Sequence, residues 1–292
     1  MKKIDNYIVS KSNNLINCRH DLNLNEQKIV LILAANIQPD DMELTEKKIS
    51  ITELAEILEI SSQNLYRDIP KITKSLMAKV VEFEMVNDKG QTELVQTTFL
   101  SIARYNKNTG MVTLEFNKFL APYLLELKEF FTTYKLKNAL MLKSKYAIRI
   151  YEKCKCNAYK RNFIWTLDEI RNELCLTQKT YTIFGKVKEK ILTPVIKELN
   201  DKTDLNISYE EIKESKKVVA INITVKEAKR DKNISKNNNI KNKKEDVITN
   251  IGVSGNYTMN NSKRLKGKTF TKEKIKKAEE LENALTFWYI QE

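Results

Sequence analysis

The stretch from residue 51 to residue 79 decides the fold and reads ITELAEILEISSQNLYRDIPKITKSLMAK. Apolar residues in Ile51–Leu58 recur at the spacing of one helical face. A short break at residues 59–62 leads to a longer helix, predicted from about Gln63 to Lys79. Its inward face would consist of Leu65, Ile69, Ile72 and Leu76. Two helices joined by such a break form a helix-turn-helix.

The flanking segments extend this pair into a winged helix. Upstream, Asn23 or Asn25 can cap a helix that runs through Glu26–Ala35 and ends before Pro39. Downstream, alternation and turn residues predict strands and turns. They are a strand at 80–86, a turn at 87–90, a strand around 97–105, a turn at 106–110 and a strand at 111–116.

The same plan then repeats. Helices are predicted at about 118–133 and 143–158, followed by a segment at 165–174 that aligns with the first helix at an offset of 116 residues. A long helix from about Phe184 to Asn200 and strands at 205–209 and 218–225, around a polar turn at 213–217, complete the repeat. The sequence therefore predicts an α+β protein with two tandem winged-helix domains from about residue 20 to residue 228.

These patterns divide the chain into four parts. We expect an N-terminal winged-helix domain at 1–135 and a second one at 136–228. The Asn- and Lys-rich run that begins at Lys229 has almost nothing to bury, so residues 229–270 read as a disordered basic linker. Residues 271–292 show an amphipathic helical pattern that could dock on the body of the protein or on a partner.

The charge points to a polyanionic partner. The 292 residues include 51 Lys and Arg and 38 Asp and Glu, giving a formal net charge of +13. This balance favours nucleic acid first and an anionic membrane surface second. Residues 229–292 hold 15 basic and 8 acidic residues, so +7 of the charge lies there and +6 in residues 1–228.

No stretch approaches the ~18 apolar residues of a spanning helix, and the N-terminus lacks a signal-peptide pattern. We therefore expect a cytoplasmic protein without membrane insertion.

Several chemistries are disfavoured by the residues themselves. The single histidine, His20, cannot supply the paired histidines of a nicking enzyme or a zinc protease. The four cysteines include only one C-x-C pair, so free thiols are expected. The run Gly267–Thr269 resembles the end of a phosphate-binding loop, but Ser262 replaces its leading glycine. We expect no enzyme, no metal and no cofactor.

Two helical faces carry segregated positive charge. On the predicted helix from Phe184, the face opposite the apolar residues holds Lys186, Lys190, Thr193, Lys197 and Asn200, with no acid among them. The earlier long helix projects Arg67, Lys71 and Lys74. Because a solvated face normally mixes signs, phosphate and base contacts explain these faces better than solubility does. Solubility, with lysines covering apolar stems, remains the alternative.

Two features leave alternatives open. Both long helices contain a proline, Pro70 and Pro194, so each is either two segments or a helix with a built-in bend. At the tip of the second wing, Lys213, Lys216 and Lys217 could reach phosphates, although the adjacent acidic residues Glu210, Glu211 and Glu214 weaken that prediction.

Four ordered segments resemble the second-domain signature of the Rep_3 (RepB-type) family of iteron-plasmid replication initiators. They are Leu142–Glu152, Trp165–Arg171, Ile191–Asn200 and Thr203–Glu210, and the N-terminal half agrees through Asn25–Ala35 and Ser61–Leu76. The resemblance covers roughly residues 5–228 and implies a tandem winged-helix protein that binds directly repeated DNA at a plasmid origin. The long helix of the second domain would read bases through Lys186, Lys190, Thr193 and Lys197.

The resemblance also implies a division of labour. The first domain would hold the DNA backbone through Arg67, Lys71 and Lys74 and would mediate dimerisation. Family members commonly initiate replication as monomers and repress their own gene as dimers. Repression implies a second copy of the chain and an inverted repeat in the promoter as partners. Initiation implies a host initiator and the replicative helicase. Lysines stand where arginine–guanine forks are often expected, which favours charge and shape readout. The alternatives are a transcriptional repressor with no initiation role and, less favoured, a nicking or primase-like enzyme.

Overall fold

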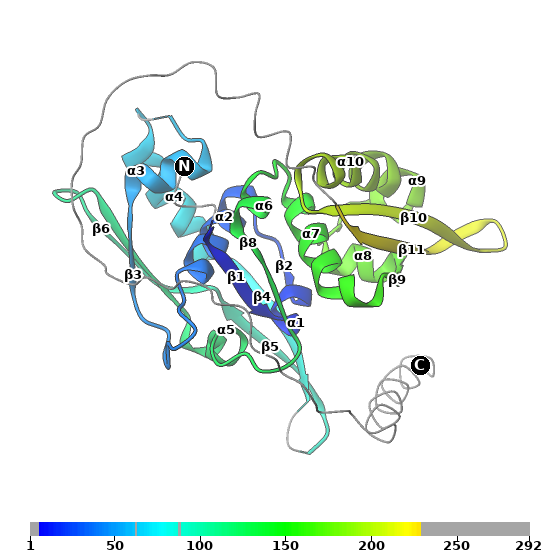
Figure 1. Cartoon of the computed structure of the whole chain (residues 1–292), viewed down its shortest axis with the longest axis horizontal. Coiled ribbons are helices and arrows are strands. Elements are labelled where there is room, and N and C mark those ends of the chain that lie inside the picture. The colour runs from blue at the N-terminus through cyan, green and yellow to red at the C-terminus, as the bar shows by residue number, and fades with distance from the viewer. Residues whose placement is uncertain (1–5, 62, 87–88, 229–292) are drawn as a thin grey trace, which may run out of the picture. The chain divides into compact units, whose positions relative to one another are not determined.

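The computed structural model describes residues 6–61, 63–86 and 89–228, and shows two winged-helix domains in succession (Figure 1). The N-terminal part contains the elements β1 (Ile8–Ser12), α1 (Asn13–Asn17), β2 (Arg19–His20), α2 (Leu24–Ala35), β3 (Lys47–Ser50), α3 (Ile51–Leu58), α4 (Leu65–Met77), β4 (Val80–Val86), β5 (Thr92–Thr98), β6 (Leu100–Asn106), β7 (Met111–Phe116), a 3₁₀ turn (Lys118–Leu120), α5 (Ala121–Leu124), β8 (Phe131–Lys135) and α6 (Leu136–Leu140).

The C-terminal part contains a second set of elements: α7 (Lys145–Asn157), a 3₁₀ turn (Ala158–Lys160), β9 (Asn162–Thr166), α8 (Leu167–Glu173), a 3₁₀ turn (Lys179–Thr182), α9 (Phe184–Val187), a π-helical turn (Lys188–Leu192), α10 (Thr193–Lys202), β10 (Leu205–Glu214) and β11 (Lys217–Glu227). The linker predicted at 229–270 and the helical pattern at 271–292 lie outside the described residues.

The two helix-turn-helix units begin in the same way. In each, a strand runs directly into the first helix, and a hydroxyl residue caps that helix. The Ser50 side chain accepts a hydrogen bond from the Glu53 N–H (3.5 Å). Thr166 accepts from the Glu169 N–H (3.2 Å), while the Thr166 N–H donates to the Glu169 carboxylate (2.8 Å), which completes a capping box. The predicted repeat of the first helix is confirmed, because α3 and α8 occupy equivalent places.

Each domain carries a three-stranded antiparallel sheet that includes its wing. The first sheet has the order β3-β7-β6, and the second has the order β10-β11-β9. In both sheets, the strand that precedes the helix-turn-helix pairs with the last strand of the wing: Ile49 pairs with Val112, and Ile164 with Asn222. The first domain has a further sheet, β2-β4-β5. The tip of its wing turns at Gly110, where φ is +64° and the chain needs the freedom of glycine.

Two predicted elements are wrong. The strand expected at about 97–105 is two strands, β5 and β6, which separate at Phe99 and pair with different partners, β4 and β7. The helix expected at 118–133 ends at Leu124; Glu126 and Phe130 have positive φ, and β8 follows. Strand β8 pairs with β1, more than a hundred residues earlier in the chain. This long-range pairing overrides the local helical pattern.

The two prolines have different outcomes. Helix α4 continues from Leu65 to Met77 with Pro70 in its interior. The second long helix consists of three consecutive segments, α9, the π-helical turn and α10, with Pro194 in the first turn of α10. The Thr193 N–H donates to the Lys188 carbonyl, five residues earlier. Pro194 therefore follows a widened turn and lies where a missing N–H removes no bond within α10.

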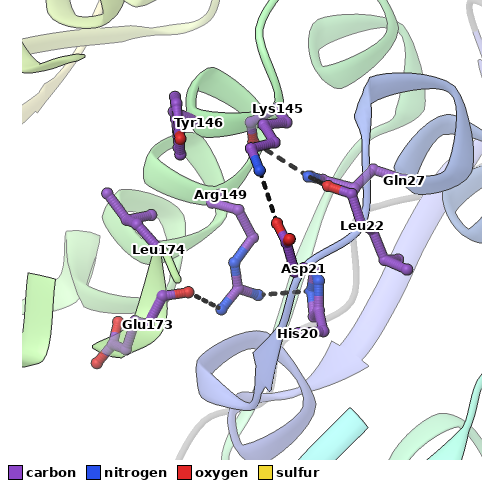
Figure 2. Close-up of a pocket in the computed structure, with 9 residues that line it drawn as sticks. All are labelled: His20, Asp21, Leu22, Gln27, Lys145, Tyr146, Arg149, Glu173 and Leu174. Carbon is purple, nitrogen blue, oxygen red and sulfur yellow. Dashed lines mark hydrogen bonds and ion pairs between the residues drawn. The ribbon is translucent and has the colours of Figure 1, made fainter. Parts of the chain in front are cut away.

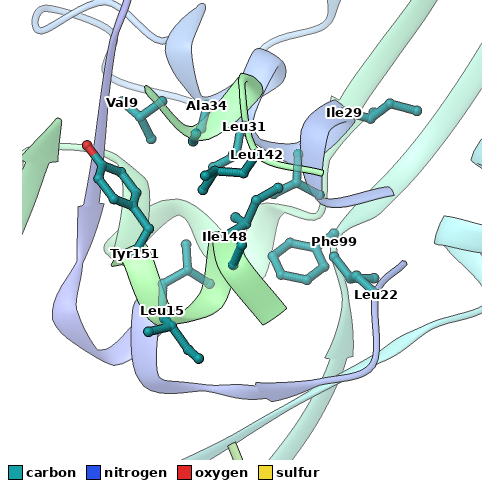
Figure 3. Close-up of a cluster of buried hydrophobic side chains, with 14 of the residues drawn as sticks. Val9, Leu15, Leu22, Ile29, Leu31, Ala34, Phe99, Leu142, Ile148 and Tyr151 are labelled. Atoms are coloured by element: carbon teal, nitrogen blue, oxygen red, sulfur yellow. The ribbon is translucent and has the colours of Figure 1, made fainter. Parts of the chain in front are cut away.

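Helix α7 is buried on several sides and contacts α1, α2, β8 and α10, so it joins the cores of the two domains. Figure 3 shows Ile148 and Tyr151 of α7 among residues of α1, α2 and the loop before β6. Ile148 and Tyr151 are 1% and 0% exposed. Two polar side chains of α7, Arg149 and Glu152, are also buried in this core.

An ion pair lies within that core. The Lys11 Nζ of β1 is 2.5 Å from the Glu152 Oε1 of α7, and both side chains are at most 5% exposed. The Tyr134 hydroxyl of β8 also donates to Glu152. Burial, followed by the adjacent Glu152 charge, raises the pKa of Tyr134 well above its ordinary value, so the hydroxyl keeps its proton and can donate.

Arg149 of α7 holds the junction between the domains (Figure 2). Its guanidinium donates to the carbonyls of Ile16 (2.8 Å), Cys18 (2.7 Å) and Glu173 (3.3 Å), the last of which belongs to α8. It also lies 3.0 Å from the His20 Nε2, and because a guanidinium only donates, that nitrogen accepts. Burial, and then Arg149, hold the pKa of His20 well below 6.5, so the imidazole is neutral.

We expect Lys11→Met to lower the free energy of unfolding by about 3–5 kcal/mol, because it leaves the Glu152 carboxylate buried without its cation. Urea unfolding followed by circular dichroism measures the change. Combining Lys11→Met with Glu152→Gln removes the unpaired charge and should recover part of the loss. A single variant as stable as the wild type would contradict the assigned role of this ion pair.

The buried His20 predicts a pH dependence of stability. The unfolded chain binds a proton at this residue below about pH 6.5, and the folded chain does not. Stability should therefore be complete above pH 6.5 and fall as the pH drops below it, with a slope that approaches about 1.4 kcal/mol per pH unit. Since His20 is the chain's one histidine, His20→Gln should flatten the profile of melting temperature between pH 7 and pH 5.5. Parallel profiles would refute this assignment.

Candidate nucleic-acid interface

The second helix of the C-terminal helix-turn-helix presents the predicted polar face to solvent. Its inward side chains, Val187, Ile191, Leu192, Val195 and Leu199, are at most 3% exposed. Lys190, Thr193 and Lys197 are exposed, and the Lys186 side chain is 45% exposed. Among the described residues, Lys190 and Lys197 have no ion-pair partner.

An acidic side chain that lies beside the basic face reaches into it. The Lys186 Nζ lies 2.8 Å from the Glu189 Oε2, one helical turn away. This hydrogen bond lowers the pKa of Glu189, which stays ionised. Lys188, outside the predicted basic face, lies 2.6 Å from the Glu211 Oε1 of β10. Glu189 therefore offsets part of the charge of Lys186, and Lys188 ties the helix to the wing.

The second wing ends in a cluster of cations. Strands β10 and β11 pair as far as Glu214 and Lys217, which leaves Ser215 and Lys216 as the loop, with Ser215 at φ +57°. Lys213, Lys216 and Lys217 are all exposed. Glu211 lies 3.7 Å from the Lys213 Nζ and closer to Lys188. One of the acidic residues that weakened the prediction for the wing is therefore paired with lysines.

In the first domain, α4 presents Arg67, Lys71 and Lys74 to solvent, as predicted. The Arg67 guanidinium is engaged by its neighbour: its Nε and second terminal nitrogen lie 2.8 and 3.3 Å from the two Asp68 carboxylate oxygens. Neither Lys71 nor Lys74 has an ion-pair partner in the described part of the chain. Tyr66, 54% exposed on the same helix, reaches the wing turn, where its hydroxyl lies 3.2 Å from the position that a Cβ would take at Gly110.

The start of α9 is held by Arg171 of α8, a residue that sequence reasoning missed. Its Nε donates to the Tyr181 carbonyl (2.9 Å), and a terminal nitrogen donates to the Thr182 carbonyl. Asp168 accepts from the other terminal nitrogen (2.9 Å). Ile183 follows directly and is 63% exposed. Its position just before the predicted start of the long helix at Phe184 was the sequence signal that could have identified it.

Comparison with known proteins gives two family matches. Residues 8–155 match the model of the initiator replication protein WH1 domain, and residues 166–225 match the model of the initiator replication protein WH2 domain. The chain belongs to this initiator replication protein family.

Individual relatives agree with the family assignment. A replication initiation protein of Escherichia coli is 30% identical over 209 residues, which cover 68% of this chain and 64% of that protein. An uncharacterised 27.6 kDa protein of Escherichia coli is 23% identical over 69% of this chain and 88% of its own length. Among solved structures, that of the Pi initiator protein in complex with iteron DNA matches with a TM-score of 0.63 and 21% identity, over 77% of this chain and 99% of that chain.

The family models fit the elements of the fold. The WH1 match runs from β1 into α7, and the WH2 match runs from the cap of α8 to Val225, near the end of strand β11. Both basic helices therefore belong to the winged-helix units of an initiator replication protein. Within the described ranges, no group of side chains has the composition of a metal site, and no helix is long and apolar enough to cross a membrane.

Proposed function

We propose that this protein is a plasmid replication initiator that binds directly repeated origin DNA through both winged-helix domains. The observation that carries the proposal is the pair of exposed basic faces, on α4 and on α9–α10, each on the second helix of a helix-turn-helix in an initiator-family chain. Two linked units of this kind can contact successive segments of one duplex. A solved structure of the same fold, at 21% identity, holds iteron DNA, which supports the proposal.

The two domains would divide the work, with the boundary proposed near residue 135. Lys186, Lys190, Thr193 and Lys197 would face the major groove, while Lys213, Lys216 and Lys217 would contact phosphates beside it. In the first domain, Arg67, Lys71 and Lys74 would hold the backbone, and the same domain would mediate dimerisation. Because a lysine is a point charge without the fork of an arginine, these residues favour charge and shape readout over bidentate base recognition.

Initiation needs an event beyond binding. We propose that the bound protein bends or loosens adjacent AT-rich DNA, whose flexible steps lower the free-energy cost of deformation. It would then recruit the host initiator and helicase in the cytoplasm, and a dimer would repress its own promoter at an inverted repeat. These steps require no covalent chemistry from the protein.

A footprint on the DNA that flanks the gene, followed by permanganate probing of the supercoiled origin, tests this function. We expect regularly spaced direct repeats to be protected and unpaired thymines to become reactive next to them. Protection of one palindrome without unpaired thymines would instead establish a repressor. Single-strand cleavage in the presence of Mg²⁺ would overturn the non-enzymatic proposal.

Lys190→Ala should weaken binding to the repeats and lower the slope of log affinity against log salt by about 0.9, because it removes one phosphate-neutralising cation. Lys226→Ala is the matched control: it makes the same charge change on an exposed residue near the end of β11, away from the wing tip. Its slope should stay close to that of the wild type. Equal slopes for all three proteins would show that α9–α10 is not the DNA-contacting face.

A further inference from the structure

An apolar side chain lies at the leading end of the basic face of the second domain. Ile183 directly precedes α9 and is 63% exposed, whereas the apolar residues on the other side of this helix are buried. The Ile183 carbonyl accepts hydrogen bonds from the N–H groups of Lys186 (3.0 Å) and Val187 (3.4 Å), so this residue is tied into the first helical turn. Exposing a side chain of this size to water is unfavourable.

The exposure of Ile183 does not come from a loose loop. Arg171 donates hydrogen bonds to the carbonyls of Tyr181 and Thr182, the two residues just before it, and Asp168 holds the guanidinium in place. The chain is therefore fixed on both sides of Ile183, by the Arg171 clamp before it and by the helical hydrogen bonds after it. A backbone that is already fixed loses little conformational entropy when a partner covers its side chain.

Ile183 stands at the N-terminal end of the helix that carries the candidate contact residues. It is the N-cap residue of α9, and Lys186 follows within the first turn of this helix. Gly185, two residues after Ile183, has open space around the position that a Cβ would take. The surface offered to a partner is one apolar side chain followed by lysines.

We infer that Ile183 is a specificity-determining residue that contacts the C5-methyl group of a thymine in the major groove. The inference rests on the proposed function, in which this face enters that groove. Residues at the N-terminal end of a recognition helix contact base edges. Of the groups on those edges, the thymine methyl is the apolar one, and it separates A·T from G·C pairs. The lysines that follow would hold the helix in the groove by their charge.

A methyl scan of the protected repeat tests this contact. Each thymine on either strand is replaced in turn by deoxyuridine, which keeps the base pair and removes only the methyl group. With the wild-type protein, we expect affinity to fall about four-fold at one or two neighbouring positions, the loss that corresponds to one buried methyl group. With Ile183→Ala, the natural repeat should bind about as weakly as the substituted one, and deoxyuridine at these positions should cause no further loss.

Two variants sharpen the test. Ile164→Ala removes an equally exposed isoleucine (63%) from the edge strand β9, and it should keep the full response to deoxyuridine. Ile183→Leu restores an apolar side chain and should restore the response. If the repeats are protected but no deoxyuridine position weakens binding, or if Ile183→Ala responds as the wild type does, the thymine contact is wrong and the proposed function stands. If no repeat is protected, both are overturned.

Discussion

The Arg149 guanidinium is the group on which the arrangement of the two domains depends. A buried cation is costly unless its N–H groups find acceptors, and the two terminal nitrogens of Arg149 find them on both sides of α7, at the Ile16 and Cys18 carbonyls and at the Glu173 carbonyl. These acceptors belong to segments that must all be folded before the charge is satisfied. The first turns of the N-terminal domain and the end of α8 are therefore linked through one side chain.

The Lys11–Glu152 pair works on the same helix in a different way. It ties α7 to the β1–β8 ribbon, whose strands come from opposite ends of the first domain. Because breaking a buried pair costs more than keeping it, the pair restricts which alternative packings are accessible. With α7 fixed by both groups, the hydrogen bond from Arg149 to the Glu173 carbonyl holds the end of α8 against it.

Sequence periodicity predicted the helix-turn-helix units well, because their apolar stripes and N-caps are local features. It failed where the partner is distant: β8 was predicted as helix because nothing near residue 131 reveals its pairing with β1. The site shows the same division. Periodicity placed Lys190 and Lys197 on an exposed face. Other contacts depend on side-chain conformation: Glu189 pairs with Lys186, Asp68 pairs with Arg67, and Arg171 donates to the chain before Ile183. Counting charges along a helix does not reveal these contacts.

These internal pairs bear on how a basic protein discriminates between DNA sites. Nonspecific affinity grows with the number of phosphates neutralised by cations, and intramolecular carboxylates already engage Arg67, Lys186 and Lys188. Each such pair must rearrange, or stay paired, when DNA approaches, so it contributes less attraction than a free cation. A surface that combines engaged cations with a few free lysines and one fixed apolar side chain relies less on net charge than +13 suggests. If the protein binds origin DNA as proposed, discrimination among competing sites depends more on contacts at the base edges.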